Sequence, residues 1–249
     1  MAPRMARTMK DRLVLCYHAV SDRWPSGLAV APGELERQMQ LLVDRGYRGV
    51  TFLDAVVGDS DDRVVAVTFD DAYRSVLEQA FPILSEHGLP GTVFVPTAHV
   101  GSGSPMSWPG IDRWIGTEYE RELTGLTWDE LTHLAEAGWE IGSHTATHAR
   151  LTELDDAALG EEMGTSRAEC ERRLGRPCVT IAYPYGATDE RVAAAAGAAG
   201  YVAGAAEDPL RGASGNTLHR SRVSVYRKDA PWRFRLKVSR AVRGIRGTR

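Results

Sequence analysis

The 249-residue chain is poor in cysteine and lacks any long apolar segment. Its three cysteines, Cys16, Cys170 and Cys178, are not spaced like metal ligands, and their odd number would leave one thiol unpaired. This argues against a disulfide framework and favours a reducing compartment. No run of about 18 apolar residues occurs, so no transmembrane helix is predicted. Residues 1–10 are basic but precede no apolar h-region, so we expect no cleavable secretory signal. These absences favour a cytoplasmic or membrane-peripheral protein.

Signatures of several enzyme classes are also missing. No Gly-x-Gly-x-x-Gly follows the first predicted strand and no Walker-type loop occurs, so neither a dinucleotide site nor a nucleotide-phosphate site is predicted. No Gly-x-Ser-x-Gly elbow is present and no cysteine lies in a catalytic context, so a covalent nucleophile is weakly supported. We predict no nucleic-acid partner.

The net charge of −3 conceals a basic C-terminal segment. Residues 227–249 contain nine basic residues and one acid, so this segment carries +8 and the remainder carries −11. Apolar residues recur there at steps of three and four, at Phe234, Val238, Ala241 and Ile245. We therefore predict a basic amphipathic helix over residues 229–249, after a domain of residues 10–228. Packing on that domain with a solvated basic face is favoured over peripheral membrane or polyanion contact, which stays open.

Short apolar strands alternate with helical patterns along the chain, which is typical of a parallel β/α architecture. Residues 64–69 form a continuous apolar run, as expected of a parallel strand buried on both faces. About seven or eight strand–helix steps favour a complete or incomplete barrel over an open sheet, and the chain length suits a single barrel. The strands are predicted at residues 13–17, 64–69, 91–95, 139–142, 179–182, 201–205 and 222–226, and the helices at 32–45, 72–87, 128–137 and 155–174.

One long connection, residues 98–124, interrupts this alternation. It carries Trp108, Trp114 and Tyr119. A loop of this length in a compact domain is usually functional, and aromatic side chains beside an active site suit stacking on sugar rings. A surface excursion with a small core of its own is equally compatible with the sequence.

Two clusters of metal-type ligands follow predicted buried strands. Asp70 and Asp71 directly follow the apolar run at residues 64–69, and His144 and His148 follow the predicted strand at 139–142. Either pair alone is more often structural, because aspartates cap turns and paired histidines are common without a metal. Both pairs, however, lie where β/α enzymes place catalytic residues, and the chain has only 7 histidines. A shared metal site is therefore favoured.

The residue types in these clusters indicate hydrolysis. Asp71, His144 and His148 make a three-ligand set that leaves positions open for water and substrate. We expect the two histidines on one face of a helical turn, so that both imidazoles reach one cation. Asp70 is left over and is predicted to accept a proton from water whose pKa the cation lowers. The sequence thus predicts metal-dependent cleavage of an amide or ester without a protein nucleophile.

Three segments resemble, in order and spacing, the first motifs of the polysaccharide deacetylases, also called the nodulation-deacetylase homology family. They are Thr68–Asp71, Ser143–His148 and Tyr183–Gly186. The resemblance covers about residues 13–226, and the Leu-Cys-Tyr-His-Ala-Val sequence at 15–20 resembles the branch that deacetylates exopolysaccharide N-acetylglucosamine. It implies a distorted (β/α)7 barrel with an outer ring of helices and a divalent metal, usually Zn²⁺. It also implies removal of an acetyl group from an N-acetylated sugar or polysaccharide.

The resemblance also implies roles for individual residues. Asp70 corresponds to the base, and the metal ligands correspond to Asp71, His144 and His148. Pro184 and Tyr185 correspond to pocket-lining residues, with the Tyr185 N–H helping to hold the oxyanion.

The sequence departs from the family pattern at two places. Ala182 stands where many members have an arginine that orients the base, and we predict that Arg220 replaces it from another strand and contributes to substrate binding. Many members also have a late histidine as general acid. His219 lies near that position, and His18 at the end of the first strand can reach the same rim and is predicted to contribute to substrate binding. Either is a proton donor or a structural histidine.

Three functions remain open from the sequence. The leading prediction is a carbohydrate N-deacetylase acting on an N-acetylated glycan. The first alternative keeps the chemistry but changes the substrate to a small or lipid-linked sugar bearing an acyl or formyl group. The second is a carbohydrate-binding protein without activity, because the missing arginine and the uncertain acid weaken the catalytic set.

Overall fold

The computed structural model describes residues 11–59, 62–207, 216–240 and 242–243. Its strands are β1 (Arg12–Tyr17), β2 (Ala19–Val20), β3 (Ala29–Val30), β4 (Arg48–Val50), β5 (Val64–Phe69), β6 (Gly91–Val95), β7 (Glu140–Ser143), β8 (Thr180–Ala182), β9 (Ala203–Ala206), β10 (Arg220–Ser221) and β11 (Val223–Ser224). The α-helices are α1 (Pro32–Asp44), α2 (Phe52–Val57), α3 (Phe81–Glu86), α4 (Trp128–Glu136), α5 (Asp156–Leu174), α6 (Glu190–Ala198) and α7 (Pro231–Lys237).

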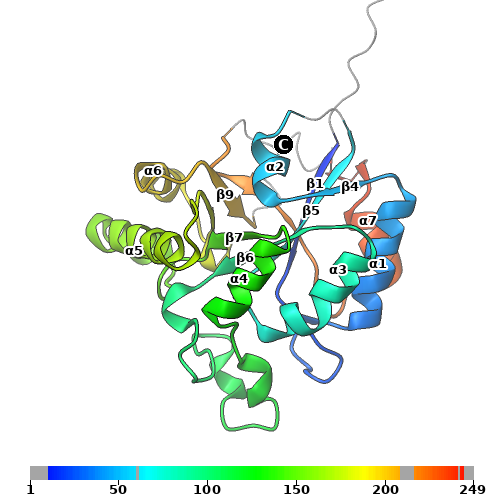
Figure 1. Ribbon diagram of the computed structural model, residues 1–249, viewed down its shortest axis with the longest axis horizontal. Coiled ribbons are helices and arrows are strands. Elements are labelled where there is room, and N and C mark those ends of the chain that lie inside the picture. Colours follow the sequence, from blue (N-terminus) through cyan, green and yellow to red (C-terminus); the bar gives the residue numbers. More distant parts are fainter. Residues whose placement is uncertain (1–10, 60–61, 208–215, 241, 244–249) are drawn as a thin grey trace, which may run out of the picture.

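The main sheet is parallel and curves into a nearly closed barrel surrounded by helices (Figure 1). Its order is β10-β9-β8-β7-β6-β5-β1-β11, and β4 also pairs with β5. β5 pairs with β1, β4 and β6 and all six of its residues are buried, as its apolar sequence requires. The prediction of a distorted (β/α)7 barrel is confirmed.

The barrel closes through one short stretch of chain. β10 pairs with β9, and β11 pairs with β1, so residues 220–224 join the two edges of the curved sheet. Arg222 lies between the two half-strands, and its N–H donates to the Ala206 carbonyl at 3.0 Å. The N–H of Val225 then donates to the Cys16 carbonyl at 2.9 Å. This break in pairing places the Arg222 side chain among the carboxyl ends of β1, β5 and β9.

The connection between β6 and α4 is the long one that the sequence predicts. It contains three short 3₁₀ helices, η2 (Thr97–His99), η3 (Asp112–Trp114) and η4 (Glu120–Leu123), and forms the green lobe at the bottom of Figure 1. Met106, Ile111 and Leu123 are almost fully buried and belong to the main hydrophobic core. The connection is therefore continuous with the barrel core.

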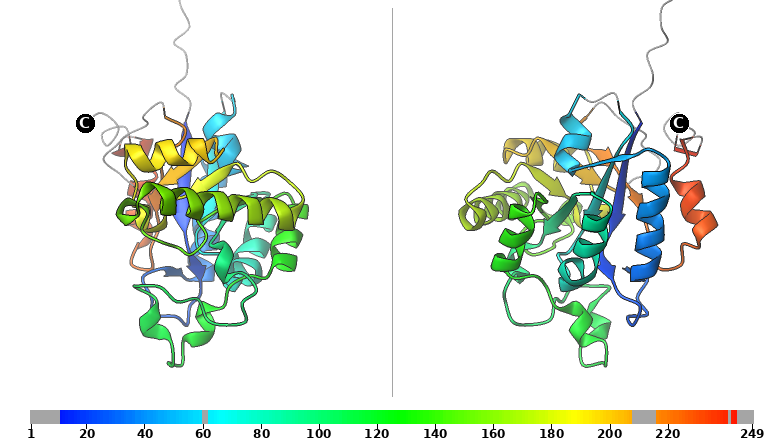
Figure 2. Two further views of the ribbon diagram at one scale, coloured as in Figure 1. Left: turned by 90° about the vertical axis from the view of Figure 1, so that its left-hand side faces the viewer. Right: turned by 45° about the vertical axis from the view of Figure 1, so that its right-hand side comes forward.

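The basic C-terminal segment contains α7, which spans only Pro231–Lys237 of the helix predicted over residues 229–249 and lies beside α1 on the outside of the barrel (Figure 2). Phe234 and Val238 are each 1% exposed and pack into the core, as the apolar stripe predicts. Ala241 and Ile245 lie outside the described residues, and the boundary at residue 229 stays a prediction. Within the described part of the chain, no helix has the length and apolar character needed to cross a membrane.

Candidate metal centre

The aspartate pair leaves β5 in an unusual backbone conformation. Asp70 donates its N–H to the Tyr17 carbonyl at 3.0 Å and so extends the pairing of β5 with β1. Asp71 and Ala72 then have φ of 70° and 55°, which is the left-handed region. Such values are uncommon outside glycine and often mark functional sites. Consecutive left-handed residues turn the chain sharply, and the helix expected from residue 72 begins at Arg74 and continues through η1 (Val76–Ala80), a π-helical turn that leads into α3.

The histidine pair lies in a loop, and the prediction of a helical turn is wrong. Thr145 and His148 have φ of 66° and 63°. The Glu162 carboxylate of α5 accepts from the N–H groups of Ala146 and Thr147 at 2.9 Å each, and the Thr147 hydroxyl donates to it at 2.6 Å. Because a side chain takes up these N–H groups, the backbone is stabilised without helical hydrogen bonds.

Asp71, His144 and His148 converge on one point. The Nε2 atoms of His144 and His148 lie 3.4 and 3.2 Å from Asp71 Oδ1. Two ligands of a tetrahedral zinc ion at about 2.1 Å are separated by about 3.4 Å, so the spacing fits a shared cation. All three side chains are at most 5% exposed, and the described residues offer no hydrogen bond to the buried Asp71 Oδ1. The set fits a divalent metal in donor chemistry and spacing.

The charges at this centre favour an ionised Asp71. Burial by itself raises the pKa of Asp71, but contacts with His144 and His148 outweigh burial and hold the pKa well below its usual value. Burial also lowers the pKa of His148, which favours the neutral imidazole that binds metals. The Nδ1 atom of His144 lies 2.8 Å from the Ala182 carbonyl, so that nitrogen carries the proton and Nε2 faces Asp71.

Asp70 does not join this set because Arg222 holds it. The two guanidinium nitrogens donate to Oδ1 and Oδ2 of Asp70 at 2.7 and 2.6 Å, in a buried pair with side chains 0% and 2% exposed. Burial raises the pKa of Asp70, but the charge and hydrogen bonds of Arg222, together with the charges of His144 and His18, outweigh burial, so the net pKa is lowered. The prediction that Arg220 replaces the missing arginine is wrong, since the arginine that pairs with Asp70 is Arg222.

Arg220 lies elsewhere in the barrel. Its pKa is lowered by burial first and then by the like charges of Arg12 and Arg243. The backbone of Arg220 pairs with Ala205 of β9, but the charges that act on its side chain are those of Arg12, which begins β1, and Arg243, rather than that of Asp70. His219 is 7% exposed and also precedes β10. A substrate role for Arg220 and an acid role for His219 stay predictions, and neither residue is among the ligand clusters.

A second group of polar side chains surrounds Asp70. Cys16, His18 and Glu207 each have an atom within 4.8 Å of the Asp70 carboxylate or of one another. The Cys16 thiol lies 3.6 Å from Asp70 Oδ2 and 3.4 Å from Glu207 Oε1, and burial raises its pKa well above the usual value. Glu207 lies 3.9 Å from Arg222, so two carboxylates share this guanidinium. Sequence reasoning missed Glu207, which follows β9 without a recognisable motif.

The segment at Pro184 and Tyr185 lies beside the histidine loop, and its role in substrate binding stays a prediction. Pro184 is buried, whereas Tyr185 is 38% exposed and has φ of 60°. The Tyr185 ring meets His148 edge-on, with centroids 4.7 Å apart, and the Arg150 guanidinium lies 4.4 Å from the Tyr185 ring centre. The partly exposed Tyr185 therefore borders the candidate metal centre.

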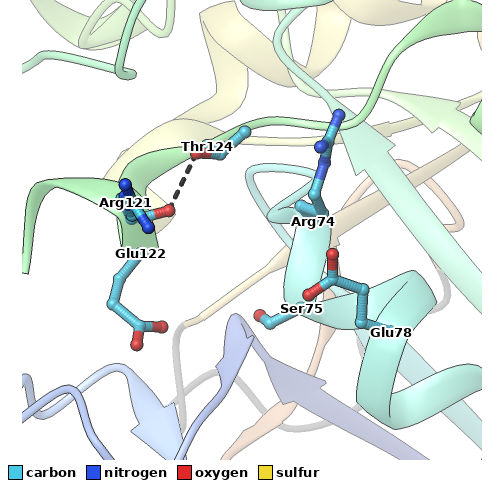
Figure 3. A pocket seen from close by; sticks show the side chains of 6 residues that line it. All are labelled: Arg74, Ser75, Glu78, Arg121, Glu122 and Thr124. Atoms are coloured by element: carbon cyan, nitrogen blue, oxygen red, sulfur yellow. Dashed lines mark hydrogen bonds between the residues drawn. The ribbon is translucent and has the colours of Figure 1, made fainter.

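A cavity of about 400 Å³ opens between the start of η1 and the long connection (Figure 3). It is lined by charged and hydroxyl side chains: Arg74, Ser75, Glu78, Arg121, Glu122 and Thr124. Arg74 follows Asp71 by three residues, but none of the predicted metal ligands lines this cavity. This cavity is therefore not the candidate metal centre.

Comparison with known proteins is consistent with this geometry. Residues 57–204 match the sequence profile of a family described as polysaccharide deacetylase. The chain belongs to the polysaccharide deacetylase family. This deacetylase is 29% identical over 219 residues to YxkH of Bacillus subtilis (strain 168), which is named for the same family, with 85% of this chain and 71% of YxkH covered.

The name of a second relative includes its substrate. The deacetylase is 24% identical over 183 residues to the poly-beta-1,6-N-acetyl-D-glucosamine N-deacetylase of Staphylococcus aureus (strain N315), covering 68% of this chain and 58% of that protein. Among solved structures, the polysaccharide deacetylase BC0361 from Bacillus cereus superposes with a TM-score of 0.74 at 26% identity, covering 91% and 68% of the two chains. IcaB from Ammonifex degensii gives 0.72 at 23% identity, with 95% and 97% covered, and shows the shared fold.

Proposed function

We propose that this chain is a metal-dependent N-deacetylase that removes acetyl groups from N-acetylglucosamine units of a glycan. One observation carries the proposal. A buried carboxylate, Asp70, is held by Arg222 next to a three-ligand set without belonging to it. Three ligands explain metal binding, and the additional carboxylate explains hydrolysis.

Asp71, His144 and His148 would hold a divalent cation, and their mixed nitrogen and oxygen donors favour Zn²⁺. When bound, such a cation polarises the acetyl carbonyl and lowers the pKa of water. The three side chains come from two strand ends and leave the remaining directions open to water and the acetyl group.

Asp70 accepts a proton from the attacking water. Arg222 holds both carboxylate oxygens, so Asp70 is ionised and fixed in orientation before the substrate arrives. The water oxygen forms a bond with the acetyl carbon, the carbon–nitrogen bond then breaks to release acetate, and the departing amine nitrogen needs a proton. His18 is the proposed donor, because it clusters with Asp70 and its buried Nδ1 has no hydrogen-bond partner within the described residues. The Tyr185 N–H and the Pro184 ring are proposed to border the acetyl group.

The proposed substrate class rests on relatives. The Staphylococcus aureus relative is named for poly-β-1,6-N-acetyl-D-glucosamine, although the match spans 58% of its length. We therefore propose a β-linked N-acetylglucosamine oligomer or polymer. A small or lipid-linked acylated sugar is the alternative substrate.

The test is acetate release by the zinc-loaded chain from β-1,6-linked N-acetylglucosamine oligomers and from chitooligosaccharides. We expect release that is abolished by EDTA and restored by Zn²⁺. Zinc and oligosaccharide binding without acetate release would instead identify a carbohydrate-binding protein. Failure to bind any divalent metal would overturn the proposed function.

The exposed face of α7 supports a proposed contact with anionic membranes. Trp232 and Leu236 are 63% and 50% exposed and lie one helical turn apart, next to the exposed Arg235. Aromatic and aliphatic side chains flanked by arginine suit the boundary between headgroups and acyl chains, and the +8 charge of residues 227–249 complements an anionic surface.

This contact is tested by co-sedimentation with phosphatidylglycerol and phosphatidylcholine vesicles. We expect binding to the anionic vesicles that falls in the double variant Trp232→Ser/Leu236→Ser. Val57→Ser is the matched control, because Val57 is 51% exposed on α2. Equal binding by all three proteins would contradict a role for this face.

A further inference from the structure

The two histidines of the candidate metal centre are supported in different ways. A metal-binding histidine usually donates its second ring N–H to a carbonyl or carboxylate, which fixes the plane of the ring. His144 has this contact with the Ala182 carbonyl. The Nδ1 atom of His148 is buried, and the described residues offer it no hydrogen-bond partner. Something other than a hydrogen bond must therefore fix the His148 ring.

Two aromatic rings enclose His148. The Trp108 ring stacks on it with centroids 4.2 Å apart and planes inclined by 17°. Tyr185 meets it edge-on at 4.7 Å and 74°. Trp108 is 7% exposed, and His99 contacts it edge-on at 5.0 Å. A flat ring packed on one face and blocked at an edge cannot rotate about its side-chain bonds without displacing a neighbour.

The backbone that carries Trp108 is tied to both ligand segments. At one end of the long connection, the Thr97 N–H donates to the Thr145 carbonyl in the histidine loop at 3.1 Å. At the other end, the Leu126 N–H donates to the carbonyl of Ala72, next to Asp71, at 2.9 Å. The connection therefore bridges the aspartate and histidine segments and presents Trp108 from a fixed position.

We infer that Trp108 is a positioning residue for the metal centre, which fixes the ring plane of His148 in place of the usual hydrogen bond. The inference rests on the proposed metal site and deepens it. It gives the long connection a role in holding the metal ligands, because one face of the Trp108 ring is already occupied by His148 and is closed to a sugar ring.

The test is the affinity of the full-length, metal-free chain for Zn²⁺, measured by competition with a chromophoric chelator. Removing the support of a ligand typically costs 10–100-fold in metal affinity, so we expect a loss of about that size for Trp108→Ala. Trp108→Phe, which retains a ring to stack, should recover most of the affinity. Trp108→Leu retains apolar bulk without a flat face and should resemble Trp108→Ala, which keeps the test valid if the alanine variant folds poorly.

Trp114→Ala is the matched control. Trp114 lies in the same connection but packs on Trp24 and Tyr119, with centroids 6.0 and 5.4 Å away, and does not contact a predicted ligand. We expect it to bind Zn²⁺ as the wild type does. Wild-type affinity in folded Trp108→Ala or Trp108→Leu would overturn the inference, as would an equal loss in Trp114→Ala. A wild-type chain that binds no Zn²⁺ would overturn the proposed function itself.

Discussion

Replacing Arg222 by alanine tests how the general base is held. The Arg222 and Asp70 side chains are 0% and 2% exposed and are joined by two short hydrogen bonds. Removing one partner of such a pair leaves an uncompensated buried charge and costs about 3–5 kcal/mol. For a protein of this size, 1 kcal/mol corresponds to about 2–4 °C in Tm, so we expect Arg222→Ala to melt about 6–20 °C lower. Arg222→Lys retains the charge but loses the two-pronged contact, and should fall between alanine and wild type.

The assay is equilibrium urea unfolding of the metal-free protein, so that zinc binding does not contribute. Arg220→Ala is the matched comparison, because Arg220 lies two residues away and faces the like charges of Arg12 and Arg243 rather than Asp70. Arg37→Ala removes an exposed ion pair with Glu34 in α1 and should change the free energy of unfolding by less than about 0.5 kcal/mol. A cost below about 1 kcal/mol for Arg222→Ala, or an equal cost for Arg220→Ala, would refute the reasoning.

Three further substitutions have expected outcomes. The pKa of Asp11 is lowered despite burial, because Arg243, Tyr47 and Arg63 contact it. The ionised carboxylate therefore stabilises the fold above about pH 3.8, and this contribution is lost below that pH. In urea unfolding, Asp11→Asn should be less stable than the wild type at pH 7, and the difference should vanish in acid. Gly91→Ala places a methyl group in the Trp139 ring and should cost about 1–3 kcal/mol in thermal unfolding, whereas Gly27→Ala, with open space around it, should be neutral. Glu162→Ala frees the histidine loop and should lower Zn²⁺ affinity about 10-fold in a chelator competition, and an unchanged affinity would contradict the role assigned to Glu162.

The strands and the clustering of Asp71, His144 and His148 are predictable because their signals are local. Val64–Phe69 is apolar at every position except Thr68, and a carboxylate pair directly after such a strand can only lie at its carboxyl end. The arginine that holds Asp70 was not predictable in the same way. Arg220 and Arg222 differ by two positions, and the choice between them depends on the break between β10 and β11, which exists only because the barrel closes there.

The loop at His144–His148 shows a second limit of sequence patterns. A spacing of four residues fits one face of a helix, but the structure bends the chain with left-handed residues at Thr145 and His148. The carboxylate that stabilises this bend belongs to Glu162, on another element. The stack of Trp108 on His148 likewise depends on how a long connection folds back, and periodicity carries no information about such a contact.

The central claim is that Asp70 acts as base while Asp71 binds the metal, although the two are neighbours in sequence. Its most direct test is to measure bound zinc and acetate release together for Asp70→Asn and Asp71→Asn. The account predicts that Asp70→Asn binds one Zn²⁺ per chain with near wild-type affinity and releases no acetate, whereas Asp71→Asn loses both. Acetate release by Asp70→Asn at the wild-type rate, or zinc retained by Asp71→Asn but lost by Asp70→Asn, would contradict it.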